Sequence, residues 1–560
     1  MQPHIELVWF SSLVKLSPYT TELPRSCQKG QAFRGESFHC QLMFRSKEMH
    51  NRIAKVEVVS DLPFPVTLRE VGYVPVVFTG YFPCDADVIS SEAGIYPDKL
   101  LPMKDNNTRF IIRQSKTLWL TADIPENCPA GTYSIRLKLT VEPDECDGWG
   151  GLVTTQKVEY FETPDFQLTV LPAILPAPRM KVTQWFHPDC LAAVYNVTMW
   201  SEKHWEIMQN YMQNAVKHGM NMILTPLFTL LLNVMPGQHR ALTQLLIISR
   251  KNGKYQFDFS RFDRYIHLAE EAGIRYFEIS HLFSQWGAVN APPIEVDGKI
   301  LFDGTQRAGS PEYREFLAEL LPALKAHLAE LGILERTVFH CSDEPQEKHA
   351  KAYHDAITTL KKHLPDCRII DAINNTQVFH NCEMDTPVPL TSDLYKFQDI
   401  PLKERWTYYC CGPTDAVPNR FIHWPSSRNR IIGVLLWMYR IDGFLHWGYN
   451  FYFEALSRFL LDPEKDSTCN SFYPPGDGFL VYPGKDGRPL DSIRHEVFFE
   501  ALQDVRALDL LTELTSREYV EKKLISWCKK LTMTEYPRGE KAVLDLRSKI
   551  NQEILNHLEK

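Results

Sequence analysis

The chain has 560 residues, more than one hydrophobic core usually supports, so two or three domains are expected. Its composition is ordinary for a globular protein, with 44% hydrophobic and 23% charged residues. The net charge is −8 and no long run of Lys or Arg occurs. Because a surface that follows phosphates needs clustered positive charge, nucleic-acid binding is not expected.

Cysteines and the N-terminus restrict the class further. The 13 cysteines are odd in number and form no CxxC pair, so neither a disulfide framework nor a zinc site is indicated. The opening MQPHIELVWFSSLVKL lacks a basic segment, and Glu6 interrupts its apolar stretch, unlike a signal peptide. No apolar run approaches the ~20 residues that span a bilayer. We therefore expect a cytoplasmic protein with no membrane partner.

Residues 1–172 show the pattern of a β domain. Apolar side chains alternate with polar ones in short runs that turn residues separate, as in CPAGT at 128–132. This spacing predicts an antiparallel β-sandwich. The proline-rich stretch at 171–181 then marks a domain boundary. The alternating residues include Phe38, Cys40, Leu42 and Phe44, then Tyr133, Ile135, Leu137 and Leu139, then Phe166, Leu168 and Val170.

Residues 180–490 change to strands alternating with helices. Helices are predicted over about 202–218, from an N-cap at Ser260, and from Ser310, with glycine stops at Gly219, Gly273 and Gly332. Each is followed at once by a short apolar strand. Eight strand candidates begin near 182, 221, 275, 336, 368, 391, 406 and 443.

Eight such units predict an α/β domain of the (β/α)₈ TIM-barrel type, in which the fifth to seventh units are too short for regular helices. An open doubly wound sheet is the main alternative, although no GxGxxG or P-loop follows a strand. From 491 to 560 the pattern is helical. The first part fits an eighth barrel helix, and the rest predicts a charged tail that packs on the barrel.

In a barrel enzyme the site lies at the carboxyl ends of the strands. The residues expected there combine carboxylates and imidazoles with aromatic rings, which stack on the apolar face of a sugar. A serine nucleophile elbow and an HExxH motif are missing. The candidate substrate-binding residues are His187, Glu278, His281, Trp286, Asp371, Tyr409, His446, Trp447, Tyr449 and Asn450.

Asp343 and Glu344 form the candidate catalytic pair at the end of the fourth strand. A carboxylate at the partly desolvated entrance of a barrel can have its pKa raised and act as a general acid. The same two residues would equally suit the start of the next helix, because negative charge favours a helix N-terminus. Both roles stay open, and for His187, His281 and His446 a structural role is the simpler interpretation.

The chain resembles glycoside hydrolase family 123 over about 180–490 and, with the preceding β domain, over most of its length. The stretches that carry the resemblance are FHPDC at 186–190, HGMNMILTPLF at 218–228, EISHLFSQWGA at 278–288, HCSDEP at 340–345, RWTYYCCGP at 405–413, SSRNRIIG at 426–433 and GFLHWGYNFY at 443–452.

The resemblance implies a retaining exo-β-N-acetylgalactosaminidase that uses substrate-assisted catalysis. The sugar's own acetamido oxygen would attack the anomeric carbon and form an oxazoline. Asp343 would hold the acetamido N–H, while Glu344 would protonate the leaving oxygen and then activate water. Neither a metal nor an organic cofactor is then required. A small glycoside or oligosaccharide with a terminal N-acetylhexosamine is the expected substrate, and a homo-oligomer is compatible with the sequence.

Two alternatives compete with this interpretation. The first is a glycosidase for a sugar without an acetamido group, which would need a further carboxylate such as Glu278 or Asp371 as nucleophile. The second is a carbohydrate-binding protein without activity, because fold does not fix function.

Overall fold

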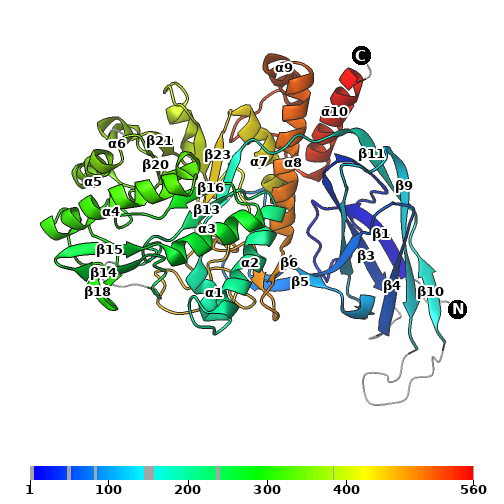
Figure 1. Ribbon diagram of the computed structural model, residues 1–560. Coiled ribbons are helices and arrows are strands. Elements are labelled where there is room, and N and C mark those ends of the chain that lie inside the picture. Colours follow the sequence, from blue (N-terminus) through cyan, green and yellow to red (C-terminus); the bar gives the residue numbers. More distant parts are fainter. Residues whose placement is uncertain are drawn as a thin grey trace.

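The N-terminal part of the computed structural model is two packed β-sheets (Figure 1). The structure describes residues 5–46, 52–80, 85–143, 157–234, 240–382 and 384–558. Strand neighbours are antiparallel, as expected, except that β2 and β11 run parallel. One sheet has the order β1 (Ile5–Ser11), β3 (Ser37–Ser46), β8 (Lys116–Asp123), β5 (Thr67–Val76) and β6 (Gly94–Pro102). The other has β2 (Lys29–Arg34), β11 (Phe166–Ile174), β9 (Gly131–Val141), β4 (Arg52–Ser60) and β7 (Asn107–Phe110), with β10 (Glu159–Glu162) on β9.

The alternating apolar residues fill the space between these sheets. Leu42 and Phe44 of β3 meet Ile135, Leu137 and Leu139 of β9 in one fully buried cluster. Because side chains of a strand alternate between two faces, the period-2 pattern of the sequence is the direct cause of this packing.

The central part is an eight-stranded parallel sheet that curves into a nearly closed barrel. The end strands approach each other where the amide of Tyr408 donates to the carbonyl of Pro389 at 3.0 Å. The sheet order is β21 (Thr386–Val388), β20 (Arg368–Ala372), β19 (Thr337–Phe339), β16 (Tyr276–Ile279), β13 (Met222–Thr225), β12 (Lys181–Gln184), β23 (Gly443–His446) and β22 (Trp406–Tyr408).

Seven of the eight strand starts are confirmed to within one residue, and the sixth was wrong. The strand expected near 391 is the 3₁₀ helix η4 (Thr391–Phe397), and the true strand is β21. Its three residues include Pro387, which cannot donate to a ladder and so weakened the sequence pattern.

Helices connect the strands and cover the outside of the barrel (Figure 1). The side chains of Ser201 and Ser310 cap α2 and α4, and Gly273 ends α3 in the left-handed conformation. Ser260 does not act as the N-cap; it is the first residue of α3, after Phe259. These helices are α1 (Pro188–Val194), α2 (Glu202–Lys217), α3 (Ser260–Ala272), α4 (Pro311–Glu330), α5 (Ala350–His363), α6 (Thr376–Asn381) and α7 (Ser426–Met438).

The fifth and sixth units are short, as expected, but the seventh is not, because it carries the regular 13-residue helix α7. Every residue of α7 except Met438 is buried, so α7 has no polar face and no amphipathic period. Its Gly433 lies so close to α8 (Ile493–Leu514) that an added Cβ would be 2.0 Å from the carbonyl oxygen of Ala501.

The helices α9 (Arg517–Cys528) and α10 (Glu540–Leu558) complete the predicted C-terminal helical region. In the described part of the chain, no helix has the length and apolar character to cross a membrane.

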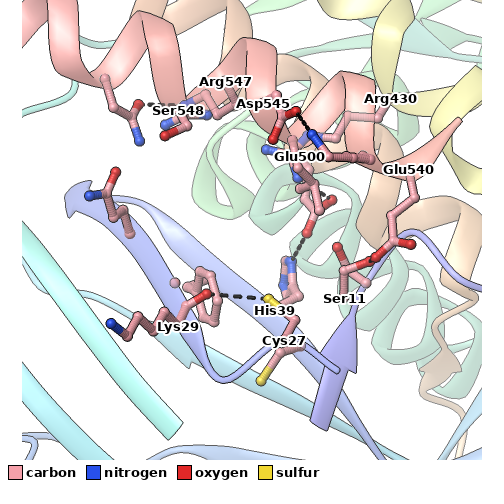
Figure 2. A pocket seen from close by; sticks show the side chains of 18 of the residues that line it. Ser11, Cys27, Lys29, His39, Arg430, Glu500, Glu540, Asp545, Arg547 and Ser548 are labelled. Atoms are coloured by element: carbon pink, nitrogen blue, oxygen red, sulfur yellow. Dashed lines mark hydrogen bonds and ion pairs between the residues drawn. The ribbon is translucent and has the colours of Figure 1, made fainter. Parts of the chain in front are cut away.

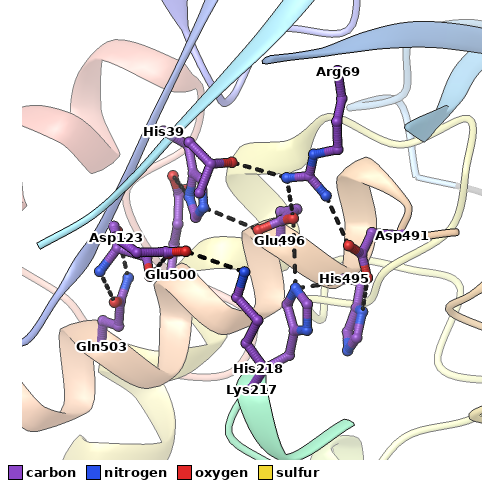
Figure 3. Close-up of polar contacts among 12 residues, drawn as sticks. His39, Arg69, Asp123, Lys217, His218, Asp491, His495, Glu496, Glu500 and Gln503 are labelled. Atoms are coloured by element: carbon purple, nitrogen blue, oxygen red, sulfur yellow. Dashed lines mark hydrogen bonds and ion pairs between the residues drawn. The ribbon is translucent and has the colours of Figure 1, made fainter. Parts of the chain in front are cut away.

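A cluster of charged side chains joins the β-sandwich to α8, and we call it the seam (Figure 3). His39 of β3 contacts Glu496 at 2.9 Å and Glu500 at 3.2 Å. Arg69 of β5 pairs with Asp491 at 2.7 Å and also with Glu496. The seam therefore fixes the sandwich against the helix that follows the last barrel strand.

Candidate active site

Two cavities lie far apart in the fold. The one in Figure 2, of about 390 Å³, lies between the sandwich and α8 and α10, and its charged groups largely pair with one another, as in Arg430–Glu500 and Arg547–Glu36. The other, of about 280 Å³, lies at the carboxyl ends of the barrel strands and contains both candidate catalytic carboxylates. Its lining is Trp185, Leu232, Asn233, Gln285, Trp286, Asp343, Glu344, Ala372, Tyr408, Cys410, Cys411, Leu445, Trp447, Phe472 and Tyr473.

Asp343 and Glu344 follow β19 in an irregular turn and do not cap a helix. The 3₁₀ turn η3 (Glu347–His349) begins after Gln346, and α5 begins after His349, in both cases without a side-chain cap. Glu344 has φ of 43°, a left-handed backbone that costs a residue other than glycine about 1–3 kcal/mol. Strain of this kind clusters at functional sites, where the surrounding structure holds it in place.

The loop after β16 is tied to the catalytic turn by hydrogen bonds. The amide of Trp286 donates to the carbonyl oxygen of Asp343 at 2.7 Å. Ser342 Oγ donates to the carbonyl of Ser284 at 2.7 Å and accepts from the amide of Ala288 at 3.1 Å. Trp286, a predicted substrate-binding residue, is thereby held on the wall beside the pair.

A buried ion cluster lies beneath the pair. His340 Nδ1 contacts Asp371 at 3.2 Å, and its Nε2 contacts Glu278 at 2.9 Å. Although burial opposes it, these two carboxylates raise the pKa of His340 to about 9, so the imidazole carries a charge at neutral pH. Asp371 also accepts from Tyr353 at 2.7 Å and from the amide of Cys341 at 3.0 Å, and Trp185 Nε1 donates to Glu278 at 3.1 Å.

Two residues that were predicted to bind substrate belong to this buried cluster and not to the pocket. Glu278 and Asp371 are fully buried and neither lines the pocket. His281 stacks on His340 with ring centroids 4.6 Å apart and lies outside the lining as well. His281, His340 and Asp371 are close enough for a metal, but both nitrogens of His340 already have carboxylate partners. The arrangement supports the catalytic turn from below.

The electrostatics of the pair favour a retained proton. Burial raises the pKa of Asp343 well above its ordinary range, and the charges of Glu344 and Asp371 raise it further, while His340 opposes them. Two neighbouring carboxylates titrate as a unit, and like charges cannot both ionise cheaply. Asp343 therefore keeps its proton to higher pH than an isolated carboxyl would.

Tyr408 at the end of β22 donates its hydroxyl hydrogen bond to Glu344 Oε1. Asn374 Nδ2 donates to the same hydroxyl at 3.0 Å and fixes its direction. The sequence had pointed to the next residue, Tyr409, whose ring instead packs against Phe444 and His446 outside the lining. Side chains of a strand alternate between two faces, so only one of two neighbouring tyrosines can face the pocket. In a strand of three residues the sequence pattern is too short to show which one does.

Trp447 supplies a second aromatic wall. Its Nε1 donates to Asp477 Oδ2 at 2.9 Å, and Asp477 Oδ1 lies 3.3 Å from His446 Nε2. Burial raises the pKa of Asp477 to about 7, against the opposing charge of Arg420. His187 Nε2 contacts the carbonyl of Trp447 at 2.9 Å. His446 and His187 therefore position Trp447 and do not line the pocket.

The remaining predicted residues support the barrel. Asn450 Oδ1 accepts from the amide of His187 at 2.9 Å, and Tyr449 donates to Asn214 Oδ1 at 2.7 Å toward α2. Of the twelve predicted site residues the pocket collects four: Asp343, Glu344, Trp286 and Trp447. The lining residues that the prediction missed come mainly from loops, such as Asn233 after β13 and Tyr473 after β23, which bond each other at 2.5 Å.

Comparisons with known proteins identify the family of the chain. A family model described as glycoside hydrolase 123, catalytic domain, matches residues 185–511. This match covers more than half of the chain, which therefore belongs to glycoside hydrolase family 123 and is a glycoside hydrolase. No curated protein matches.

Among solved structures, the chain is similar to a family 123 glycoside hydrolase from Clostridium perfringens studied for glycolipid glycan hydrolysis. The TM-score is 0.72 at 15% identity, with 99% of this chain and 97% of the other covered. A family 5 mannosidase from Rhizomucor miehei overlaps loosely, with a TM-score of 0.34, 11% identity, and 62% and 94% of the two chains covered. The first similarity extends the shared fold to the sandwich and the C-terminal helices.

Proposed function

We propose that the chain is a retaining exo-β-N-acetylgalactosaminidase that works by substrate-assisted catalysis. The observation that carries the proposal is the distribution of carboxylates: among the described residues that line the pocket, Asp343 and Glu344 are the only two, and they are adjacent in the chain. A conventional retaining enzyme places its two carboxyl groups ~5 Å apart on opposite sides of the bond. Two neighbours on one wall suit a reaction in which the substrate supplies the nucleophile.

The competing mechanism needs another carboxylate that can reach the anomeric carbon. Its candidates, Glu278 and Asp371, are fully buried and engaged by His340, Trp185 and Tyr353. Attack by either would require the ion cluster to open. The geometry therefore favours a sugar with its own 2-acetamido oxygen as nucleophile, held close to the reacting carbon.

In the proposed reaction the acetamido oxygen bonds to the anomeric carbon while the glycosidic C–O bond breaks. Glu344 gives its proton to the leaving oxygen, and Asp343 accepts the acetamido N–H, whose acidity rises as the oxazolinium forms. Glu344 then removes a proton from water, which opens the ring with overall retention. Donation by the acetamido N–H favours the ionised form of Asp343, so in the proposed reaction substrate binding transfers the proton of Asp343 to Glu344.

Aromatic rings give the pocket its affinity for a sugar. Trp185, Trp286, Trp447 and Tyr473 surround the carboxylates and offer flat apolar faces. The small volume suits one sugar unit and hence removal of a terminal residue.

The test is hydrolysis of chromogenic β-N-acetylgalactosaminide, β-N-acetylglucosaminide and β-galactoside by the wild type and by Glu344→Gln. The proposal expects turnover of an acetamido sugar and a loss of at least ~10²-fold in Glu344→Gln, the usual effect of removing a general acid. Turnover of the plain galactoside alone would replace it with a two-carboxylate mechanism. The ratio between the two acetamido sugars identifies the galacto or gluco preference.

A further inference from the structure

A second hollow adjoins the active pocket and shares Gln285 and Trp286 with it. It has a volume of about 810 Å³ and is more open to solvent. We call it the basic groove and define it by Gln285, Trp286, Asn290, Arg307, Lys348 and His349. Because the two hollows meet at Trp286, a glycan whose terminal sugar fills the pocket can continue into the groove.

The wall between the two hollows is rigid. Gly287 packs so closely on the ring of His349 that an added Cβ would lie 2.4 Å from its Cβ and Cγ. The amide of Trp286 is already bonded to the carbonyl oxygen of Asp343. Trp286, 37% exposed, therefore has its backbone held beside the catalytic pair, and it lines both hollows.

Two polar atoms on this wall are buried without a partner. Gln285 is 9% exposed; its Oε1 accepts from the amide of Asn233 at 3.0 Å, but its Nε2 has no partner among the described residues. Nδ1 of His349 is likewise buried and unpartnered. A buried donor left without a partner costs about 1–3 kcal/mol, which a ligand oxygen would recover.

The charge of the groove has one sign. Arg307 and Lys348 are exposed, and neither forms an ion pair within the described residues. The described lining contains no carboxylate of its own. The carboxylates of the shared wall, Asp343 and Glu344, belong to the neighbouring pocket. The groove is thus an aromatic platform flanked by two unpaired cations.

We infer that the basic groove binds the leaving-group side of the substrate and selects an anionic sugar, one that carries a carboxylate or a sulfate. This inference rests on the proposed function. Trp286 stacks on the second sugar, Gln285 Nε2 donates to one of its oxygens, and Arg307 and Lys348 attract the anionic group. Guanidinium and ammonium groups both bind such oxyanions, and the guanidinium can do so through two parallel hydrogen bonds.

The experiment uses three disaccharides with the same terminal β-linked N-acetylhexosamine. Their second sugar is a neutral hexose, the matching hexuronic acid, or the hexose with a sulfate on O6. We expect kcat/KM for at least one anionic disaccharide to exceed the neutral one by roughly 3- to 10-fold, as two exposed ion pairs can supply. The ratio falls toward 1 as salt rises, because exposed charges are screened. The larger ratio identifies carboxylate or sulfate.

Variants separate the groove from general surface charge. Arg307→Gln/Lys348→Gln brings the ratio to about 1, whereas Lys351→Gln, an exposed lysine of α5 outside the groove, keeps the wild-type ratio. Equal kcat/KM for all three disaccharides in the wild type overturns the inference and leaves the proposed function intact. If the wild type hydrolyses none of them and no aryl N-acetylhexosaminide, the proposed function fails, and the inference fails with it.

Discussion

Glu496 at the seam and Asp343 in the active pocket are both carboxylic acids, and their pKa values shift in opposite directions. At the seam, Glu496 touches Arg69 and His39, and these cations hold its pKa well below the ordinary range despite burial. In the pocket, burial and the charges of Glu344 and Asp371 raise the pKa of Asp343 well above it. At the seam the charges of the cationic partners outweigh burial, whereas at Asp343 burial and the neighbouring carboxylates outweigh the charge of His340.

The backbone shows the same contrast. The seam residues lie in β3, β5 and α8 or directly before α8, whereas Glu344 lies in an irregular turn with a positive φ. Paired charges in regular elements hold two parts of the molecule together. Unpaired charges on a strained turn are available to a ligand, which is why perturbed carboxylates in clefts indicate function. Changes at the seam are expected to alter stability, and changes at the pocket to alter activity.

Asp343→Asn gives the largest expected effect. The side-chain oxygen of Asn can still accept the acetamido N–H, but it carries no negative charge to stabilise the developing oxazolinium, and kcat should fall by about 10²- to 10³-fold. The melting temperature should not fall, because one of two repelling carboxylates is gone. Because the pKa of Asp343 is raised, wild-type kcat/KM should persist into neutral pH and fall only where Asp343 of the free enzyme loses its proton. Retention of activity in Asp343→Asn would return Glu278 and Asp371 to consideration as nucleophile.

His39→Gln tests the other half of the comparison, the contribution of the seam to stability. The carboxylates of Glu496 and Glu500 raise the pKa of His39 from 6.5 to about 9, so its contribution to stability is complete below about pH 6.5 and is lost as pH rises through about 9. The variant should lose about 3 kcal/mol of unfolding free energy at pH 6, and this difference should shrink above pH 9. Denaturant titrations at both pH values measure it.

The control for that variant is His267→Gln, because His267 is exposed on α3. It should leave the unfolding free energy unchanged at both pH values. Folded His39→Gln should keep the wild-type kcat/KM. A His39→Gln variant that loses activity and keeps its stability would mean that the seam takes part in the reaction.

Tyr408→Phe and Tyr409→Phe form a matched pair with the smallest expected effect. The first removes the hydroxyl that donates to Glu344 and should lower kcat/KM by roughly 10-fold or more, as the loss of a hydrogen bond to a charged group does. The second removes a buried hydroxyl that lies outside the pocket and has no hydrogen-bond partner among the described residues, and kcat/KM should not change. Steady-state kinetics of both variants decide which tyrosine serves the pocket.

Local sequence patterns predicted most strands and helices of the molecule, but they predicted only a minority of the residues that line the pocket. Alternating runs such as that of Phe38 to Phe44 located the sandwich strands, and caps such as Ser310 located the helices. The seventh unit was wrongly expected to lack a regular helix, because burial of α7 on all sides leaves no amphipathic period to detect. The strand β21 was missed because proline weakens its pattern. Asp343, Glu344, Trp286 and Trp447 were found because each follows a strand. Asn233 and Tyr473 come from loops whose course depends on tertiary contacts.

The central claim is that the substrate's acetamido oxygen is the nucleophile, and a series of aryl β-N-acylhexosaminides with zero, one, two and three fluorines on the acetyl group tests it most directly. Fluorine withdraws electrons from the amide oxygen and weakens its attack without adding much volume. The account predicts that log kcat/KM falls steeply and steadily with each fluorine. A flat series would contradict it, because it would show that the amide oxygen does not form a bond in the rate-determining step and that a carboxylate of the protein must do so.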